Sequence, residues 1–358
     1  MRILHLYRPR LPSLRAQAIQ VVHACHALAA AGHHVTLLAD RGDTGDVTEA
    51  LGAFGLAPLP TLAVYICPWR HKGLAGLWFR ARLAAWWAGP AGWVIARDKR
   101  RLQAALRAHG KKHRVLLETH ELDSALAAER GDQDDADRWA ALEAALLPHC
   151  DALVANCGGT LAAWEAAHGQ RLPQHRRACH NAISASRRRA ALPETEPVIR
   201  CVGSLRRYKG FDALLAAADG LPLPLELIGG SVAERSALAG GRVRMRPPVP
   251  YTAVPDLLAQ SRALLLPLQD NLFGRQLTSP LKLWDYLATA VPIIAPALPS
   301  VLEIAALTDT LVHTWEPGDA ASLAAAARRA VEALPRAPHV RTWEERAAEI
   351  LALMEATP

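Results

Sequence analysis

Short apolar runs alternate with longer mixed stretches along most of the chain. In the first half we expect buried strands at five of these runs: 2–7, 34–39, 61–67, 114–118 and 151–155. A helix is expected from about Ala16 to Ala31, and Gly32 is a suitable residue to end it. Strands that alternate with helices predict a parallel sheet covered by helices on both faces.

The alternation restarts after a polar, basic and proline-containing segment, SASRRRAALPETEP (184–197), which we interpret as a linker. Six further strands are expected at 197–203, 223–229, 242–246, 263–268, 291–296 and 309–313. The pattern therefore predicts an α/β protein with two Rossmann-like, doubly wound parallel-sheet domains that face each other across a cleft. We place the domains at residues 1–183 and 195–335, and expect residues 336–358 to end in a helix that crosses back to the first domain.

Composition narrows the functional classes only in part. The 358 residues are 51% hydrophobic, which suits two domains with cores of their own. A net charge of +7 favours an anionic partner, although a generally basic surface explains it equally well. The six cysteines form no CxxC pair, and neither a signal peptide nor an apolar run of about 20 residues is visible, so we expect a cytoplasmic protein.

The stretch VGSLRRYKGFDALL (202–215) is a candidate anion site. A strand is expected to end at Gly203, and a helix to begin near Gly210 after a loop with three cations. Unpaired N–H groups at the start of a helix favour an anion. A solvated basic turn is the alternative. The polar residues of the loop are Ser204, Arg206, Arg207 and Lys209.

The stretch TSPLKLWDYLATAVPIIA (278–295) predicts a second helix start. Ser279 is expected as the N-cap and Pro280 in the first turn, so that the N–H groups of Leu281 and Lys282 point at an anion. Helical spacing predicts one polar stripe and a neighbouring apolar stripe that faces the core. An exposed Lys–Asp pair is the alternative interpretation. The polar stripe comprises Lys282, Asp285, Tyr286 and Thr289, and the apolar one Leu281, Trp284, Leu287 and Ala288.

These two stretches, with LELIGG (225–230) and VPYTAVPDLLAQSRALLLPL (249–268), resemble the C-terminal half of retaining nucleotide-sugar glycosyltransferases of family four, which have the GT-B fold. The resemblance is specific over about 195–305. The first half is similar in layout only, and RTWEERAAEILALM (341–354) resembles the final helix of the family.

The resemblance implies a role for each matching residue. Lys209 would contact the donor diphosphate and act in catalysis, and Asp285 would hold the ribose in place of a glutamate. Two departures are Ser204, where the family often has arginine, and Leu277, where a glutamate commonly contacts the transferred sugar. The implied diphosphate site is Ser204, Arg206, Arg207, Lys209, Thr278, Ser279, Pro280, Leu281 and Lys282, and the nucleobase loops contain Gly229, Gly230, Val249 and Tyr251.

In the first half, the segment LLETHELDS (116–124) places His120 at the end of a buried strand. The resemblance makes His120 the candidate for a catalytic contact with the donor sugar, and a surface-loop histidine is the alternative. Glu118 and Glu121 are weaker candidates. The stretch YRPRLPSLRAQAIQ (7–20), the first loop and the helix start after it, carries three arginines that could face an anionic acceptor or the donor phosphates: Arg8, Arg10 and Arg15.

Residues 69–114 contain five of the ten tryptophans and many basic residues. The uncharged run LAAWWAGPAGWVIA (83–96) suits an interfacial segment on an anionic membrane, whereas two packed helices with tryptophans in the core are the alternative. The aspartates of GDQDDADRW (131–139) are interpreted as a helix cap, and no metal site is expected.

The resemblance implies a glycosyltransferase that moves a sugar from a UDP- or GDP-linked donor to an acceptor hydroxyl, with retention and without a metal or other cofactor. The expected acceptor is a glycan or lipid-linked molecule of polysaccharide biosynthesis, and the expected location is the cytoplasm or the inner membrane face. Alternatives are a non-catalytic GT-B subunit that binds a nucleotide, and a sugar-nucleotide epimerase. Nucleic-acid binding is not expected, because no helix-turn-helix, zinc or RNA-recognition pattern occurs.

Overall fold

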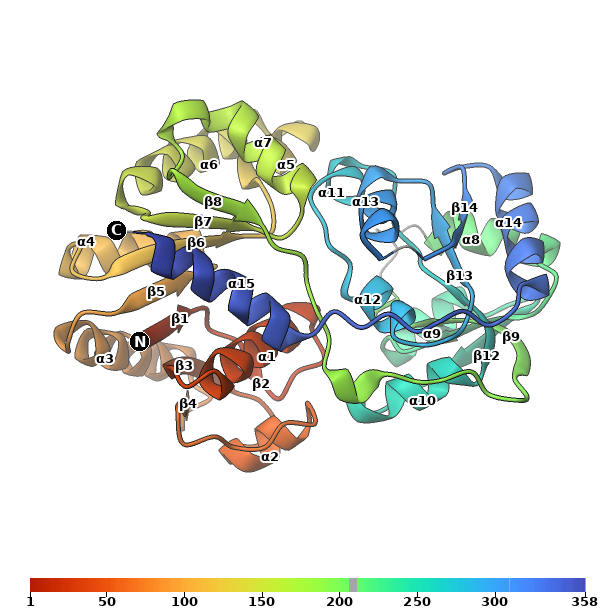
Figure 1. Ribbon diagram of the computed structural model, residues 1–358, viewed down its shortest axis with the longest axis horizontal. Coiled ribbons are helices and arrows are strands. Elements are labelled where there is room, and N and C mark those ends of the chain that lie inside the picture. Colours follow the sequence, from red (N-terminus) through yellow and green to blue (C-terminus); the bar gives the residue numbers. More distant parts are fainter. Residues whose placement is uncertain (206–210, 309, 358) are drawn as a thin grey trace. The chain divides into compact units, whose positions relative to one another are not determined.

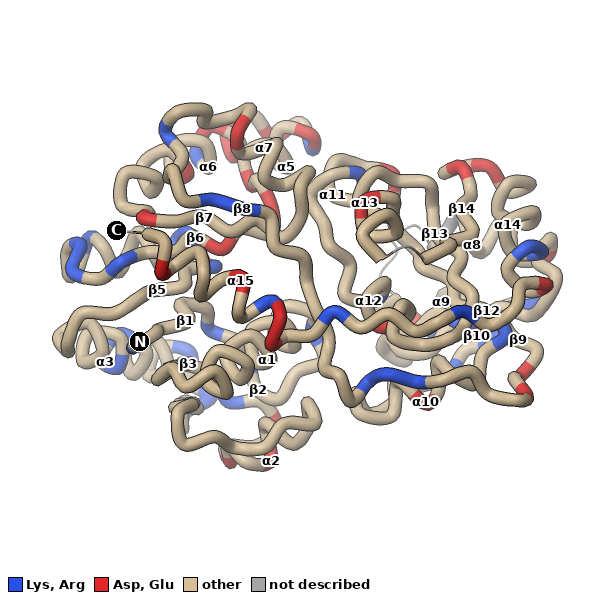
Figure 2. The backbone as a smooth tube through the Cα atoms, in the orientation of Figure 1, with Lys and Arg blue, Asp and Glu red and all other residues tan. Residues whose placement is uncertain are grey.

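The computed structural model describes residues 1–205, 211–308 and 310–357, and the chain divides into two compact units (Figure 1). Unit 1 comprises Met1–Asn181 and Thr342–Pro358, and unit 2 comprises Ala182–Arg341. From the sequence we expected the first domain to end at residue 183 and the second to extend from residue 195 to residue 335. Lys and Arg residues occur along both units rather than in one block (Figure 2).

Unit 1 is built on an eight-stranded sheet in which every strand pair is parallel. The order is β2-β3-β1-β5-β6-β7-β8, and β4 also pairs with β3. The five expected strands are present, and β2, β5 and β8 were not expected. The strands are β1 Arg2–Leu6, β2 Arg10–Leu11, β3 His34–Arg41, β4 Leu62–Ile66, β5 Trp93–Ala96, β6 Arg114–Thr119, β7 Ala152–Ala155 and β8 His175–Ala178.

The helices of unit 1 complete its layers. The C-terminal helix α15 packs against α1, and it also contacts β7 and β8, so the last segment of the chain is part of this unit. α3 contacts α4, and α4 contacts α6. The helices are α1 Ala16–Ala30, α2 Val47–Gly52, α3 Lys72–Ala88, α4 Lys99–His109, α5 Asp123–Glu129, α6 Gln133–Leu146, α7 Gly158–His168 and α15 Trp343–Ala356.

The tryptophan-rich segment 83–96 does not form two packed helices. It forms the end of α3, a turn, and the central strand β5. Trp86, Trp87 and Trp93 are all buried, because the sheet and the helix that covers it need apolar side chains between them. The interpretation of residues 131–139 as a helix cap is confirmed, since the Asp132 side chain accepts a hydrogen bond from the N–H of Asp135 at the start of α6.

Unit 2 contains a six-stranded parallel sheet in the order β11-β10-β9-β12-β13-β14. All six strands overlap the expected runs, although β14 begins three residues later than the run at 309. The strands are β9 Glu196–Val202, β10 Leu225–Ile228, β11 Val243–Arg246, β12 Ser261–Leu265, β13 Ile293–Pro296 and β14 Val312–Trp315. The helices are α8 Phe211–Ala217, α9 Val232–Leu238, α10 Val254–Ala259, α11 Leu272–Arg275, α12 Leu281–Leu287, α13 Pro299–Thr308 and α14 Ala320–Glu332.

Helix α12 buries a different set of side chains from the one expected. Leu283, Trp284, Tyr286 and Leu287 face the core. Tyr286 therefore does not belong to a polar stripe: its hydroxyl donates to the Leu265 carbonyl at 3.2 Å and accepts from the Val202 N–H at 3.4 Å. The predicted stripe was wrong because hydrogen bonds to the ends of two strands let a tyrosine enter the core.

The basic segment 184–197 is not a free linker. It belongs to unit 2, and Glu196 already begins β9. Arg187 is buried, and Arg189 forms an ion pair with Asp256. The prediction of a linker was wrong because arginines of this segment form ion pairs with carboxylates that are distant in the sequence.

Candidate functional site

The candidate donor site lies where the strand order of unit 2 reverses. β9 has β10 on one side and β12 on the other. In open parallel sheets, ligands bind outside the carboxyl ends of strands at such a point. The loop after β9, the loop after β10 and the start of α12 meet here, as shown by contacts among Gly203, Gly229 and Lys282.

Two glycines let these loops approach closely. Gly203 and Gly229 have φ values of 130° and 131°. A Cβ atom on Gly229 would lie 2.1 Å from the Gly203 carbonyl oxygen, and the Gly203 N–H donates to the Ile228 carbonyl at 2.8 Å. No residue with a side chain fits at Gly229 unless the backbone moves, so the loops present main chain rather than side chains at this edge.

Lys282 supplies the positive charge at this edge. Its Cε lies 2.7 Å from the position of a Cβ on Gly203, and its Nζ donates to the Cys201 sulfur at 3.6 Å. Within the described residues no carboxylate forms an ion pair with this partly buried ammonium group. Because a thiol is a weak acceptor, Lys282 keeps most of its capacity to bind an anion.

Other residues of the predicted diphosphate site are arranged differently. Ser204 is exposed, whereas Thr278 and Ser279 are buried. Arg206, Arg207 and Lys209 lie outside the described residues, so their roles stay predictions.

Ser279 is not the N-cap of α12. The N-cap is Pro280, and the helix begins at Leu281. The Ser279 hydroxyl instead accepts a hydrogen bond from the Trp284 indole N–H at 3.0 Å. A buried indole N–H needs a hydrogen-bond acceptor, and the Ser279 hydroxyl serves as that acceptor instead of capping the helix amides.

Asp285, the predicted ribose ligand, is held by an arginine. Arg187 Nε donates to Asp285 Oδ1 at 2.7 Å, and Arg187 Nη1 donates to the Tyr251 carbonyl at 3.1 Å. The guanidinium also stacks over the Tyr251 ring at 4.0 Å. Asp285 therefore does not pair with Lys282, three residues away, and the contact with Arg187 was not predicted. Burial raises the pKa of Tyr251, and the Asp285 carboxylate adds to this rise.

The predicted nucleobase loops show two further features. Gly230 has a φ of 66°, and its carbonyl accepts from Arg235 Nη1 at 2.7 Å. Val249 is partly buried. Their proximity to a base stays a prediction.

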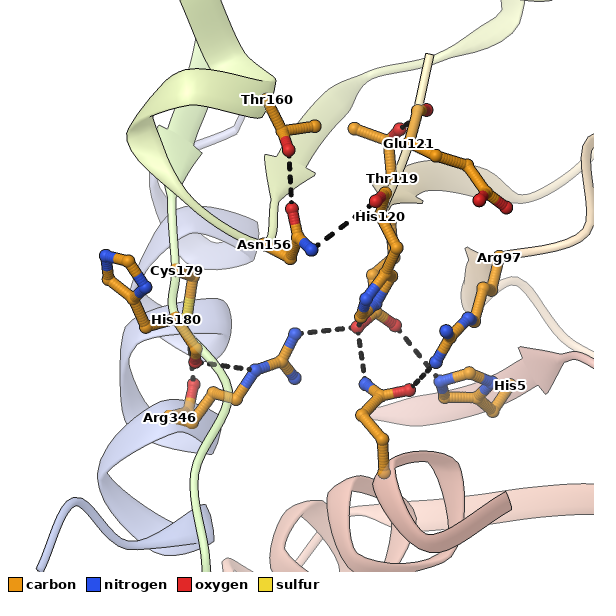
Figure 3. A network of polar contacts seen from close by, with 12 residues as sticks. His5, Arg97, Thr119, His120, Glu121, Asn156, Thr160, Cys179, His180 and Arg346 are labelled. Carbon is orange, nitrogen blue, oxygen red and sulfur yellow. Dashed lines mark hydrogen bonds and ion pairs between the residues drawn. The ribbon is translucent and has the colours of Figure 1, made fainter. Parts of the chain in front are cut away.

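Unit 1 contains a buried charged network centred on Glu118, at the end of β6. Figure 3 shows this network with His5, His120 and Arg346 labelled. Arg346 Nη2 and Gln20 Nε2 donate to Glu118 Oε1 at 2.6 and 2.7 Å, and His5 Nε2 lies 3.2 Å from Oε2. Burial alone would raise the pKa of Glu118, but Arg346 and hydrogen bonds from His120 and His5 hold it well below the usual range. Glu118 is thus an ionised acceptor that fixes its neighbours.

His120 is oriented by this carboxylate. Its Nε2 lies 3.0 Å from Glu118 Oε1, and its backbone carbonyl accepts from Asn156 Nδ2 at 3.4 Å. Burial and the Arg97 guanidinium lower the pKa of His120 to about 4, although the hydrogen bond to Glu118 raises it. The imidazole is therefore neutral at pH 7 and donates from Nε2, which leaves Nδ1 as an acceptor. His120 is 11% exposed, so it is not the surface-loop histidine of the alternative interpretation.

The arginines of the first loop differ from one another. Arg8 forms an ion pair with Asp40, whereas Arg10 and Arg15 are exposed. Arg97, a cation that we did not predict, follows β5 directly (Figure 3). Its guanidinium lies over the ring of Tyr7, which precedes Arg8 in the first loop. It was missed because β5 itself was not recognised as a strand.

Comparison with known proteins agrees with this architecture. Residues 196–333 match the family model described as Glycosyl transferases group 1. The structure of sucrose-phosphate synthase from Thermosynechococcus elongatus superposes with a TM-score of 0.71 at 19% identity, covering 99% of this chain and 98% of that one. The chain has the GT-B fold.

Two other GT-B structures are similar over nearly their whole length. Anabaena Alr3699/HepE in complex with UDP-glucose has a TM-score of 0.64 at 13% identity, with 100% of this chain and 95% of that chain covered. WaaG, a glycosyltransferase involved in lipopolysaccharide biosynthesis, has a TM-score of 0.64 at 16% identity, with 97% and 93% covered. No curated protein matches the chain.

Two kinds of feature are absent from the described residues of this GT-B chain. Over residues 1–205, 211–308 and 310–357, no group of three His, Cys, Asp or Glu side chains is arranged to hold a metal ion. Among the helices that the structure describes, none combines the length and the apolar character needed to cross a membrane.

Proposed function

We propose that the chain is a glycosyltransferase that moves a sugar from a nucleotide-sugar donor to an acceptor hydroxyl, with retention and without a metal. The observation that carries the proposal is Lys282, an ammonium group with no carboxylate partner in the described part of the chain, beside two closely packed glycine loops. The family match over 196–333 and the GT-B fold support it.

In this reaction negative charge grows on the diphosphate as the glycosidic C–O bond breaks. Lys282 stabilises that charge, and so does Lys209 in the role that the resemblance implies. Preorganised donors of this kind typically contribute about 3–4 kcal/mol each to lowering the barrier. Asp285, fixed by Arg187, accepts hydrogen bonds from the ribose hydroxyls through the oxygen that Arg187 leaves free. Neutral His120 accepts a hydrogen bond from a sugar hydroxyl at Nδ1.

The donor is proposed to be UDP- or GDP-linked. HepE, whose fold is similar to that of this chain, was crystallised in complex with UDP-glucose. The acceptor is proposed to be a glycan or lipid-linked molecule, reached in the cytoplasm or at the inner face of a membrane. WaaG, of similar fold, is involved in lipopolysaccharide biosynthesis.

A donor panel tests the proposal first. Thermal unfolding is measured with UDP-, GDP-, ADP- and TDP-sugars, since a donor present at 100 times its dissociation constant stabilises the protein by about 2.7 kcal/mol. With the donor that binds, sugar release or transfer is then followed by NMR, which shows the anomeric configuration of the product. Retained configuration and unchanged turnover in EDTA support the proposal. Binding to no nucleotide-sugar contradicts it.

A non-catalytic nucleotide-binding subunit is the second candidate, because of Leu277. This side chain is fully buried and apolar where the family commonly has a sugar-contacting glutamate. The two functions differ in one measurement. If the donor binds tightly but the purified protein neither hydrolyses nor transfers its sugar to any acceptor of an envelope-glycan panel, the subunit function is favoured.

A further inference from the structure

The outward face of helix α3 is apolar. Leu74, Leu77 and Ala81 recur at helical spacing, and all three are exposed. Leu74 and Leu77 are 48% and 59% exposed. A helix on the surface of a soluble domain normally carries polar side chains on this face. α3 is apolar on its inner face as well, where the buried residues are Ala75, Phe79, Leu83, Trp86 and Trp87.

Two arginines border this outward face. Arg80 and Arg82 precede and follow Ala81, and successive residues of a helix point in directions about 100° apart, so the arginines lie on opposite margins of the stripe. Both are exposed, and the Arg82 guanidinium lies 4.6 Å from the centre of the Tyr65 ring. Among the described residues no carboxylate forms an ion pair with either arginine. Both charges are therefore available to an external anion.

The part of the chain around α3 is strongly basic. Residues 69–114 contain twelve Lys or Arg residues and one acidic residue, Asp98. Lys99, Arg101 and Lys111 form ion pairs with carboxylates, and the other cations of this range have no carboxylate partner in the part of the chain that the structure describes. Some of these cations belong to α4, which contacts α3 (Figure 1). An apolar stripe among uncompensated cations is complementary to an anionic bilayer, which has charged headgroups above an apolar interior.

Exposed aromatic side chains accompany the helix. Trp69, in the segment just before α3, is 47% exposed, and Tyr65 on strand β4 is 39% exposed. The other tryptophans near α3 differ from Trp69, since Trp86, Trp87 and Trp93 are buried in unit 1. Tryptophan and tyrosine favour the headgroup level of a membrane, where the ring meets apolar chains and its N–H or O–H meets water.

A second copy of this chain fits the face less well than a bilayer does. A symmetric dimer through α3 would bring the same uncompensated cations of both copies together, and like charges repel. Exposed leucines of another helix do not form a comparable face. On α13, Leu302 and Leu307 are five positions apart and therefore point to different sides, and Glu303 lies next to Leu302.

We propose that the outward face of α3, with Trp69 before it and Arg80 and Arg82 at its margins, docks unit 1 onto an anionic lipid bilayer. Leu74 and Leu77 enter the interfacial zone, and the arginines bind lipid phosphates. This docking surface goes beyond the proposed function, which leaves the location open between the cytoplasm and a membrane face. Docking requires neither donor binding nor sugar transfer.

The test is sedimentation of the full chain with lipid vesicles. Wild-type protein is expected to bind vesicles of phosphatidylglycerol and phosphatidylcholine in equal parts, more weakly as salt is added, and to bind phosphatidylcholine alone far less. Leu74→Ser/Leu77→Ser is expected to bind the anionic vesicles at least about 10-fold more weakly, since it loses apolar area that enters the bilayer. Arg80→Gln/Arg82→Gln is expected to lose about 5-fold for each charge removed.

The matched control is Leu302→Ser/Leu307→Ser on α13. These leucines are 46% and 63% exposed, close to the values for Leu74 and Leu77, and their replacement should leave vesicle binding as in wild type. Thermal unfolding of both double variants shows whether the fold is retained.

A fluorescent label reports the contact directly and changes only one exposed side chain. All six cysteines are buried, so the new thiol of Leu77→Cys is selectively labelled with an environment-sensitive dye. Its emission is expected to shift to shorter wavelength when anionic vesicles are added, because the dye enters an apolar environment. The same label on Leu307→Cys is expected to show no shift.

Several results would overturn the docking surface. These are wild-type protein that does not bind anionic vesicles, equal binding to neutral and anionic vesicles, equal vesicle affinity of Leu74→Ser/Leu77→Ser and wild type, or an unchanged emission of the label on Leu77→Cys. A wild-type dimer that Leu74→Ser/Leu77→Ser converts to a monomer would show that a second copy covers the face instead.

The nucleotide-sugar panel separates this proposal from the proposed function. Wild-type protein that binds a donor but no anionic vesicle refutes the docking surface and leaves the proposed function intact. Protein that binds anionic vesicles through α3 but no nucleotide-sugar supports the docking surface and contradicts the proposed function.

Discussion

The ion pair between Arg187 and Asp285 makes a strong prediction about stability as well as function. Their side chains are 6% and 17% exposed, and one hydrogen bond of 2.7 Å joins them. Replacement of Asp285 by alanine leaves the guanidinium buried without its carboxylate. Among the described residues Arg187 Nη2 already has no hydrogen-bond partner, so the variant adds a second unpaired donor to the same group.

The size of the effect follows from this burial. Removing one partner of a buried pair costs about 3–5 kcal/mol. We take the lower end, about 3 kcal/mol, because Asp285 keeps some contact with water. In the double variant Arg187→Met/Asp285→Ala no charge is left unpaired, so we expect about 2 kcal/mol of the loss to be recovered.

The assay must report on unit 2 alone, because two compact units need not unfold together. We suggest urea unfolding followed by hydrogen exchange of peptides from β12 and β13. With a urea dependence of about 2 kcal/mol per molar, Asp285→Ala should lower the midpoint by roughly 1.5 M. Asp256→Ala is the matched control. It breaks the ion pair of Asp256, which is 63% exposed, with Arg189, and should cost less than about 1 kcal/mol.

Two results would refute this reasoning. One is an Asp285→Ala variant whose unit 2 is as stable as that of the wild type. The other is a double variant whose destabilisation equals the sum of the single ones, which would mean that the two side chains do not interact. Donor affinity should be measured below the urea midpoint of each variant, so that weaker ribose binding is distinguished from unfolding.

Three further predictions concern single residues. Lys282→Ala should lower turnover about 100- to 1000-fold while the far-ultraviolet circular dichroism spectrum is retained. Lys282→Arg should be less affected. Equal steady-state rates of Lys282→Ala and wild type would show that Lys282 has no part in the mechanism. The pKa of His120 is lowered to about 4 in the folded state, so the unfolded state binds this proton first as the pH falls. The free energy of unfolding of the wild type, measured by urea titration, should therefore fall by up to about 3 kcal/mol between pH 6.5 and 4. The His120→Asn variant should lack this loss. Gly229→Ala should destabilise unit 2 by about 2 kcal/mol or more, since its Cβ would meet a backbone oxygen, whereas Gly240→Ala, also at positive φ but with open space around it, should cost less in the same assay.

Regular elements were the most predictable part of the chain. Runs of five to seven residues located eleven of the strands, and most of these runs are apolar because a strand buried on both faces needs consecutive apolar residues. The start of α1 and the extent of α15 were also close to their predicted bounds. β5 was missed because WVIA follows the apolar end of α3 after only a short turn, so the two elements formed one continuous run.

Polar residues of the candidate sites were predicted less well. Ser279 has the residue type and position of an N-cap, yet an indole five residues later takes its hydroxyl. Arg187 lies in a segment with the composition of a linker, yet it is buried against Asp285. In both cases the local pattern permits several partners, and burial of a competing polar group decides among them.

The sequence by itself determined two parallel sheets and the glycine loops at the edge of the second, because these depend on local hydrophobic periodicity and on backbone conformations that few residues adopt. Only the tertiary structure decided which charges meet. Glu118 binds Arg346, 228 positions away, Asp285 binds Arg187, 98 positions away, and Arg97 has no carboxylate in the described part of the chain. Charge pairing depends on distances of a few ångströms between residues from different elements, and these distances are set when the chain packs.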